Sequence, residues 1–431
     1  MRPQDLPRFR QSPTDPAFVQ DPYPVYARMR ALGPAVFWED YGHAVFTRHA
    51  EVSALLRDRR FGREVTHIAS REALGWDPIP DRLAPFHALD AHSLLEREPP
   101  AHTRLRRLVN RAFTSRAIAR LAPGIEATAH RLIDAMPADP AAPFDLVETF
   151  AEPLPMAVIA GLLGAPEAEG KRMLAWSHDM VGMYQAGRDR AAEDRAVAAA
   201  AAFADWMRAL IARRRAAPGE ALIDALIAAE DEGERLSGEE LVATCILLLN
   251  AGHEATAHAL GNAARLAMEG RLDPSVFAGP AATPAAAETA ADETLRFDPP
   301  LHMFARYALG DVAGGETTVS LNAAGGGAGE RAEAVTFRLG EVAGLLLGSA
   351  NRDPAAFADP DRLDPAREGA ARHVAFGAGI HFCVGAPLAR MELRLGLGAL
   401  FARRPGLCLD EPATYRDAYH FHGHAALRVR G

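Results

Sequence analysis

The sequence predicts a mainly α-helical protein with a minor β-rich region, and three observations support that fold class. Residues 118–232 are rich in alanine and leucine and follow a helical pattern that breaks only near prolines. Residues 241–266 form the longest apolar stretch, and their length also favours a helix. Short runs of β-branched and aromatic residues, such as 35–38 and 44–47, indicate a few strands.

Length and composition favour one large domain. The chain has 431 residues, of which 49% are hydrophobic, so a large core can form. No Ser/Gly-rich linker separates two self-contained patterns, and we therefore expect an N-terminal extension over residues 1–20 and a single domain over residues 21–431. The formal net charge of −9 argues against general affinity for nucleic acid.

The cysteines and the first residues bear on the compartment. Cys245, Cys383 and Cys408 lie far apart, an odd and sparse set that suits a reducing compartment better than a disulfide framework. The chain begins without the basic-then-apolar pattern of a signal peptide, and no apolar run is long enough to cross a bilayer. We therefore expect a soluble cytoplasmic protein without a membrane partner.

The first part of the domain is predicted to contain a helix, a hairpin and an irregular segment. Residues 21–24, Asp-Pro-Tyr-Pro, open a short helix with apolar side chains on one face. The runs 35–38 and 44–47 flank the turn-like residues 40–42 and indicate a β-hairpin. Residues 62–97 have poor periodicity and scattered prolines, which is typical of irregular structure.

Two basic side chains share one face of a helix that is predicted to begin near residue 98. His102 and Arg106 are four residues apart, so they lie side by side and can clamp a carboxylate. Arg104, Arg107 and Arg111 point elsewhere. These three arginines form either a solvated face or a docking patch for an acidic protein.

The apolar helix over residues 241–266 changes character halfway along. It is too polar after Asn250 to cross a membrane, so we expect it to cross the protein core. Small residues at Ala251 and Gly252 would let a flat ligand lie against the helix. Such sites are also where helices kink or widen.

Three weaker features follow towards the C-terminus. Glu293 and Arg296 are three residues apart and share a helical face, although such pairs are also common at surfaces. Residues 317–337 include a low-complexity Ala/Gly run and predict an extended, mobile loop to which we assign no function. Residues 419–424 predict a hairpin turn whose histidines could bind metal, line a pocket or face solvent.

The most informative stretch is residues 376–385, a glycine-rich loop that brings one thiol to the start of a helix. Gly377 and Gly379 permit tight turning because they lack a Cβ. Cys383 would meet free N–H groups and the positive end of the helix dipole. Both favour the thiolate, which is the form that binds a metal.

This stretch resembles the heme-binding loop of the cytochrome P450 family, Phe-Gly-x-Gly-x-His-x-Cys-x-Gly, at every fixed position. The resemblance implies that Cys383 is the axial thiolate of heme b, iron protoporphyrin IX. It implies that Phe376 packs beside the iron–sulfur bond and that His381 hydrogen-bonds a heme propionate. It also implies one triangular, mostly helical domain, with the heme between the helix over residues 241–266 and the Cys383 loop.

Three other motifs match the same family in the same order: the pair His102 and Arg106, the long helix over residues 241–266, and the pair Glu293 and Arg296. His102 with Arg106, and Arg306 further along the chain, correspond to contacts with the heme propionates. Glu293 and Arg296 correspond to a buried structural pair that is joined by an arginine from a later loop. Arg362 is our candidate for that arginine.

One departure from the family pattern concerns proton delivery. Most members carry an acid and then a threonine in the long helix, whereas this chain has Glu254 and then Ala255. Thr256 comes one residue later and is rotated by about 100° around the helix axis, so its hydroxyl does not simply replace the missing one. A substrate hydroxyl with ordered waters, a distorted helix or weakly coupled oxygen activation could explain the change, and we favour the first. Glu254 remains a candidate relay acid.

The resemblance also implies a substrate pocket beside the heme, roofed by the irregular segment over residues 62–97. Each candidate for its lining could equally be an ordinary core residue. The candidates are Phe86, Leu89, Leu94, Met183, Leu248, Ala251, Leu301, Met303, Phe304 and Phe421.

The implied reaction inserts one oxygen atom of O2 into a small organic substrate, which the sequence does not identify. The resemblance is to the bacterial soluble type, in which a ferredoxin and its reductase supply the electrons, and it implies a monomer. Two alternatives are a peroxide-driven heme-thiolate peroxygenase and a thiolate-heme sensor or carrier that binds a ligand without turnover.

Overall fold

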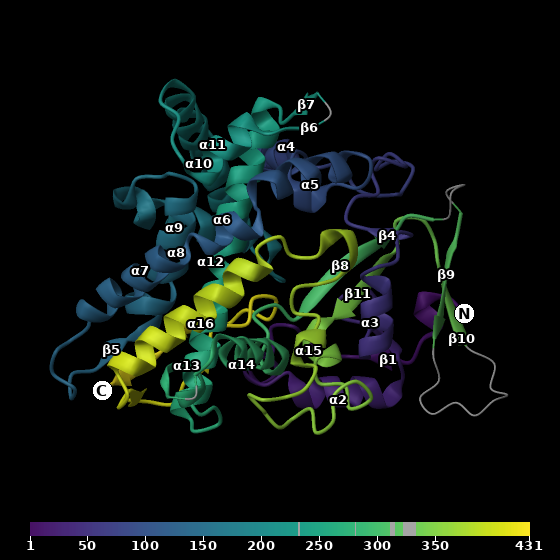
Figure 1. Cartoon of the computed structure of the whole chain (residues 1–431). Helices are drawn as coiled ribbons and strands as arrows, with labels where there is room; N and C mark the ends of the chain where they lie inside the picture. Colours follow the sequence, from purple (N-terminus) through teal and green to yellow (C-terminus); the bar gives the residue numbers. More distant parts are fainter. Residues whose placement is uncertain (232, 281, 311–314, 322–332) are drawn as a thin grey trace.

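The computed structural model describes residues 1–231, 233–280, 282–310, 315–321 and 333–431. Helices gather on one side of the molecule and the larger sheet lies on the other, as Figure 1 shows. The fold is therefore mainly α-helical with a minor β-rich part, as the sequence predicts. Within the described residues, no helix combines the length and apolar composition that a membrane crossing requires.

The longest helix, α12 (Gly238–Met268), contains the whole predicted stretch over residues 241–266. Ser237 caps its N-terminus, where the serine side chain accepts a hydrogen bond from the backbone N–H of Glu240. The helix stays α-helical to its end. It packs against α16 (Ala386–Arg403), the helix that follows Cys383 (Figure 1). The other α-helices are α1 (Pro16–Gln20), α2 (Tyr23–Leu32), α3 (His49–Leu55), α4 (Ala84–Asp90), α5 (Ala101–Ala112), α6 (Ser115–Ala119), α7 (Ala122–Asp134), α8 (Pro153–Leu162), α9 (Gly170–Val181), α10 (Arg190–Ala216), α11 (Leu222–Ala228), α13 (Ser275–Ala278), α14 (Pro284–Phe297) and α15 (Leu347–Ala350).

The largest sheet has six strands in the order β1-β2-β3-β11-β8-β4. The predicted hairpin is confirmed, because β2 and β3 pair antiparallel with Val36 opposite Val45. These six strands are β1 (Arg8–Phe9), β2 (Ala35–Trp38), β3 (His43–Phe46), β4 (Phe61–Gly62), β8 (Met303–Ala308) and β11 (Val342–Leu346). The remaining strands are β5 (Phe144–Asp145), β6 (Glu230–Asp231), β7 (Glu234–Arg235), β9 (Thr317–Leu321), β10 (Glu333–Phe337), β12 (Cys408–Leu409), β13 (Thr414–Tyr415), β14 (His424–Ala426) and β15 (Arg428–Arg430).

Residues 1–20, which we expected to be an extension, pack onto this sheet. Strand β1 pairs parallel with β2, with Arg8 opposite Phe37. Phe18 and Val19 of α1 are almost fully buried in the core that also contains Tyr26 of α2. Burial of these apolar side chains holds the segment against the rest of the fold.

The segment 317–337, which we expected to be one long loop, is a pair of strands where the structure describes it. Strands β9 and β10 pair antiparallel, with Val319 opposite Val335. Both valines are buried, which gives this small sheet an apolar face. The Ala/Gly run over residues 323–329 lies outside the described residues.

Candidate active site

The loop over residues 376–385 adopts the tight geometry that its glycines predict. Gly377 and Gly379 have φ values of +67° and +71°, which residues with a side chain rarely adopt. A Cβ at Gly379 would collide with the carbonyl oxygen of Leu56, just beyond the end of α3. The backbone N–H of Cys383 donates to the carbonyl of Phe376 at 3.0 Å and closes the loop.

The thiol of Cys383 is partly exposed and has hydrogen-bond donors directed at it. Burial raises the pKa of the thiol, while the N–H groups of Gly385 and Ala386 and the charge of Arg106 act in the opposite direction. Burial is the larger effect, so the pKa of the free thiol stays above its ordinary value and the donors only reduce that rise. The predicted combination of a thiol with the start of a helix is therefore present.

Helix α14 anchors this loop through one carboxylate. Asp292 accepts a hydrogen bond from Nε of Arg390 at 2.6 Å and lies 3.2 Å from Nε2 of His373. The guanidinium of Arg390 lies 4.7 Å from the ring centroid of Phe376. These contacts fix the side of the loop that carries Phe376.

The predicted structural pair is confirmed, but its third member is not Arg362. Arg296 and Glu293 are fully buried and form two hydrogen bonds, at 2.7 and 2.8 Å. Arg367 donates from Nε to both carboxylate oxygens of Glu293, at 3.0 and 3.1 Å. The side chain of Arg362 is 67% exposed and pairs with Asp364 instead, so the Arg362 prediction is wrong. Arg362 contributes only its backbone carbonyl, which accepts from Arg296 and Arg367.

The predicted basic residues of α5 converge on the Cys383 loop. His102 is 2% exposed, neither of its ring nitrogens has a hydrogen-bond partner, and burial lowers its pKa to about 4. Its ring lies 4.4 Å from that of His381, measured between centroids. Arg106 donates to the carbonyl of Phe382 at 2.8 Å. Nε2 of His381 contacts Glu98 at 2.9 Å, so one of its ring nitrogens is already engaged.

Strand β8 adds a third basic group. Arg306 is 4% exposed and donates to the carbonyl of Ala305, and no acidic side chain among the described residues forms an ion pair with it. Burial lowers its pKa to about 10. Phe304 lies two residues before Arg306 and therefore shares this face of the strand. Its ring lies against the Cys383 loop, since a Cβ at Gly377 would be 3.3 Å from it.

These residues fit heme b. A buried cation without an acidic partner is costly, and the carboxylates of a bound heme would supply that partner at Arg306. His102 likewise offers ring nitrogens without protein partners. The sulfur of Cys383 offers a thiolate, which is one of the axial ligands that hold heme iron in proteins.

Two small residues of α12 lie on a face of the helix that other side chains do not cover completely. Ala251 is exposed and Ala255 is partly exposed, four residues apart on one face. Thr256 is 5% exposed on a different face, and the regular α-helix gives no support to the alternative in which a distortion brings its hydroxyl round. Of the three residues predicted to be catalytic, only Ala255 is not buried.

Glu254 points into a charged cluster that the sequence did not predict. Its Oε1 accepts from Nη1 of Arg416 at 3.0 Å and lies 3.2 Å from Nε2 of His258. Its Oε2 lies 3.4 Å from Nε2 of His178. Burial raises the pKa of Glu254, but His258, His178 and His253 outweigh it and lower that pKa to about 2. The spacing of four between Glu254 and His258 was the one signal available in the sequence.

The predicted pocket residues divide into three groups. Phe86, Leu94, Met183 and Leu248 are buried in the large helical core, and Leu89 packs against it. Ala251, Phe304, Leu301 and Phe421 are at least partly exposed, and the last two form a backbone bridge. Met303 is a wrong prediction. Side chains alternate along β8, so it points away from Phe304 and into the core with Tyr26 and Trp38.

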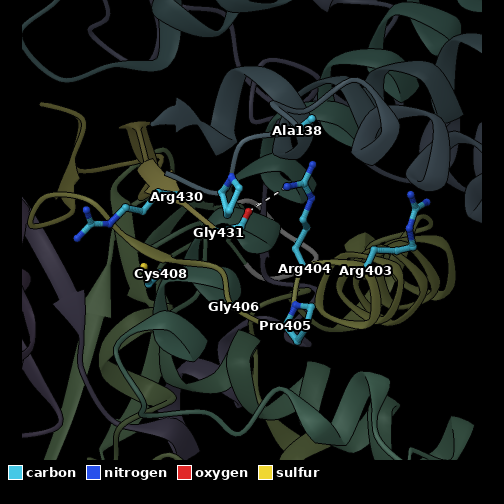
Figure 2. A pocket seen from close by; sticks show the side chains of 9 residues that line it. Ala138, Arg403, Arg404, Pro405, Gly406, Cys408, Arg430 and Gly431 are labelled. Carbon is cyan, nitrogen blue, oxygen red and sulfur yellow. Dashed lines mark hydrogen bonds between the residues drawn. The ribbon is translucent and has the colours of Figure 1, made fainter. Parts of the chain in front are cut away.

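A separate cavity of about 560 Å³ lies beside the C-terminus, and Figure 2 shows its lining. Arg403 is the last residue of α16 and Arg404 follows it, and Nη1 of Arg404 donates to the carbonyl of Gly431 at 3.0 Å. The exposed thiol of Cys408 lies on this cavity. None of the residues predicted for the active site lines it.

Comparison with known proteins agrees with this arrangement. A family model described as Cytochrome P450 matches residues 84–265 and 333–403. The chain is 36% identical to the Vitamin D(3) 25-hydroxylase of Pseudonocardia autotrophica, covering 96% of this chain and 94% of that protein. It is 38% identical to the Nocardicin C N-oxygenase of Nocardia uniformis subsp. tsuyamanensis, covering 91% and 90%.

Solved structures show the same fold. A structure of P450BioI in complex with an acyl carrier protein ligated to hexadec-9Z-enoic acid matches with a TM-score of 0.82 and 29% identity. The match covers 96% of this chain and 99% of that chain. The chain therefore belongs to the cytochrome P450 family: it is a heme-thiolate monooxygenase that binds heme b and uses O2 to oxidise an organic substrate.

Proposed function

We propose that Cys383 is the axial ligand of the heme iron and that four basic residues hold the propionates. The observation that carries this proposal is the partly exposed thiol in the glycine loop, with the N–H groups of Gly385 and Ala386 directed at it. The bound heme supplies the oxygen-activating chemistry, and the thiolate favours O–O cleavage. The N–H donors moderate how much electron density the sulfur gives.

The four propionate residues act through charge and hydrogen bonding. Arg306 and Arg106 neutralise carboxylates, and His102 donates from a ring nitrogen that has no protein partner. His381, whose Nε2 contacts Glu98, would use its other ring nitrogen. Phe376, under the guanidinium of Arg390, would shield the sulfur from water.

Replacement of Cys383, with replacement of Cys408 as the control, tests the ligand assignment. Cys383→Ser is expected to abolish the thiolate-type optical shift of the reduced carbon monoxide complex. Cys408→Ser is the matched control, because that thiol lies in a different, exposed position, and it should leave the shift unchanged. A retained shift in Cys383→Ser would refute the assignment.

We infer that proton delivery uses a substrate hydroxyl and ordered waters beside Ala255. Thr256 lies on another face of α12, and the histidines around Glu254 lower the pKa of its carboxyl to about 2. An ionised carboxylate accepts a proton before it passes one on, so Glu254 would act as a relay and not as the first donor. The open face at Ala251 and Ala255 leaves room for the waters.

The Ala255 position also favours a second candidate function, a peroxide-driven peroxygenase. Peroxide brings both oxygen atoms and the reducing equivalents, so such an enzyme depends less on a proton-delivering hydroxyl. Product formed from peroxide alone, at a rate equal to the electron-driven rate, would favour this candidate. Product that depends on an electron donor would favour the monooxygenase cycle.

We propose a ferredoxin and its reductase as the electron donors, docking over Phe382. This side chain is 39% exposed and lies next to Cys383, so it offers a short path towards the heme. The basic patch considered from the sequence is reduced, because Arg104 forms an ion pair with Glu240 and Arg107 lies 3.5 Å from Glu234. Phe382→Glu should raise the ferredoxin concentration needed for half-maximal turnover, whereas unchanged dependence would contradict the docking site.

We propose that the substrate is an organic molecule of the kind oxidised by the relatives. The two relatives above are named for vitamin D(3) and nocardicin C, which differ in structure, so neither is selected for this chain. Phe304, Leu301 and Phe421 give the pocket an apolar edge near the loop. A substrate panel analysed by mass spectrometry tests this proposal, since an oxygenated product identifies the class.

A further inference from the structure

Outside the heme site, three potential metal ligands converge between α9 and α12. His178 lies on α9, and His253 and Glu254 lie on α12, which packs against α9 (Figure 1). One ligand atom from each of the three lies within 4.8 Å of the other two. Nε2 of His178 is 3.4 Å from Oε2 of Glu254, and Nδ1 of His253 is 3.8 Å from the same oxygen.

These converging atoms have no hydrogen-bond partner, which is a second and independent observation. Nε2 of His178, both ring nitrogens of His253 and Oε2 of Glu254 are all buried and unpartnered. His253 is fully buried and Glu254 is 3% exposed. Buried polar atoms are normally satisfied, so several unsatisfied atoms at one point indicate a missing positive group.

The surroundings orient the carboxylate towards that point. Oε1 of Glu254 accepts from Arg416 at 3.0 Å and lies 3.2 Å from Nε2 of His258. Oε2 is therefore the atom left for a further ligand. Metal-binding carboxylates commonly have such outer partners, which fix their direction.

The set of donors selects the class of ion. Two imidazole nitrogens and one carboxylate oxygen form a ligand set that zinc uses in proteins. Bonds of about 2.0–2.2 Å in a tetrahedron place neighbouring ligand atoms about 3.3–3.6 Å apart, a range that includes the shorter distance found here. Glu152 lies 3.7 Å from Nε2 of His178 and could complete the set, as could a water.

We propose that His178, His253 and Glu254 bind Zn²⁺ or a similar divalent transition-metal ion, at a site distinct from the heme. The side chain of His178 is 36% exposed, which provides a path for the ion. A bound ion would link α9 to α12 and should therefore reduce local unfolding of α9. This proposal does not depend on Cys383 or the propionate residues, but it competes with the relay role of Glu254, because a carboxylate that holds the ion cannot also pass a proton.

Zinc titration of the heme-loaded protein tests the site. The titration uses a Cys408→Ser background, because the exposed thiol of Cys408 is itself a zinc ligand. Calorimetry is expected to show one zinc ion per chain. His178→Gln should weaken binding by at least about tenfold. His130→Gln removes an exposed histidine on α7 and is the matched control, which should bind as the parent does.

A second measurement separates this site from zinc bound elsewhere. Zinc should slow amide hydrogen exchange in α9 of the parent and of His130→Gln, but not of His178→Gln. The unchanged heme spectrum of each variant shows that it is folded. No stoichiometric zinc binding in the parent, or equal zinc affinity in His178→Gln, would overturn the proposal.

Discussion

Two clusters of the same composition occupy different regions of this protein. Asp298, His302 and His422 meet between α14 and the C-terminal strands, and His178, His253 and Glu254 meet between α9 and α12. Each has two imidazoles and one carboxylate, with one ligand atom of each residue within 4.8 Å of the others. Composition and spacing alone do not distinguish the two.

The carboxylates differ in how fully they are satisfied. Oδ1 of Asp298 accepts from the hydroxyl of Tyr23 at 2.7 Å. Its Oδ2 accepts from Tyr415 at 2.5 Å and from Arg265 at 3.1 Å. In contrast, one oxygen of Glu254 has no hydrogen-bond partner. A saturated carboxylate is a structural element, whereas an unsaturated one keeps the capacity to bind an ion.

The largest expected loss of stability concerns a third buried carboxylate, that of Glu293, which is also fully satisfied. Arg367→Ala removes one of its two buried arginine partners and should lower the free energy of unfolding by about 3–5 kcal/mol. Arg362→Ala should change it by less than about 1 kcal/mol, because that side chain is 67% exposed. Urea unfolding of the heme-loaded proteins, followed by circular dichroism, measures both values. Equal losses for the two variants would contradict the arrangement of this network.

Charge removal at the two clusters gives the next largest effect. Asp298→Asn should lower the free energy of unfolding by about 2–3 kcal/mol, because Arg265 and one tyrosine lose a charged acceptor. Glu254→Gln should cost about 1 kcal/mol, since Arg416 and His178 are partly exposed and can be rehydrated. The same urea measurement compares them. A larger loss for Glu254→Gln would reverse the distinction drawn between the clusters.

Acid should weaken the saturated cluster in a defined pH range. Burial lowers the pKa of His422 to about 4, below the ordinary value of 6.5. The unfolded chain therefore binds more protons between these values, so the stabilisation is complete above pH 6.5 and is lost as the pH falls towards 4. By pH 5 the loss is about 2 kcal/mol for this histidine. Unfolding midpoints at pH 5, 6 and 7 should show a shallower decline in His422→Gln than in the parent.

The smallest expected effect concerns Ala255, which lies next to Glu254 on α12 but on the exposed face of the helix. Ala255→Thr should raise the fraction of consumed O2 that appears in product, by less than about tenfold, or 1.4 kcal/mol. Oxygen consumption measured together with product tests this. Thr256→Val is the control and should leave the fraction unchanged, because Thr256 lies on another face. An effect of Thr256→Val as large as that of Ala255→Thr would support proton delivery through Thr256 instead.

Local patterns predicted much of this structure. The existence of α12, the hairpin of β2 and β3, and the glycine loop around Cys383 depend on residues close in sequence. The pairing of Glu293 with Arg296 is likewise local to one helical turn. Short-range geometry determines such features, so the sequence contains the necessary information.

Long-range partners were harder to predict. Arg362 and Arg367 lie in the same loop, and only the folded backbone decides which of them turns inwards. Arg416 reaches Glu254 across 162 residues of sequence, so no spacing rule relates them. Met303 is apolar like its neighbour Phe304, and strand alternation separates them only once the sheet is known.

The left-handed glycines of the Cys383 loop define which positions an engineer could diversify. Any side chain at Gly379 would strike the carbonyl of Leu56, and Gly377 lies against the ring of Phe304. A saturation library at these two codons would consist largely of inactive clones. A library at Ile380 and Phe382, which are at least partly exposed, would instead vary the preference for electron donors and leave the heme-binding loop intact.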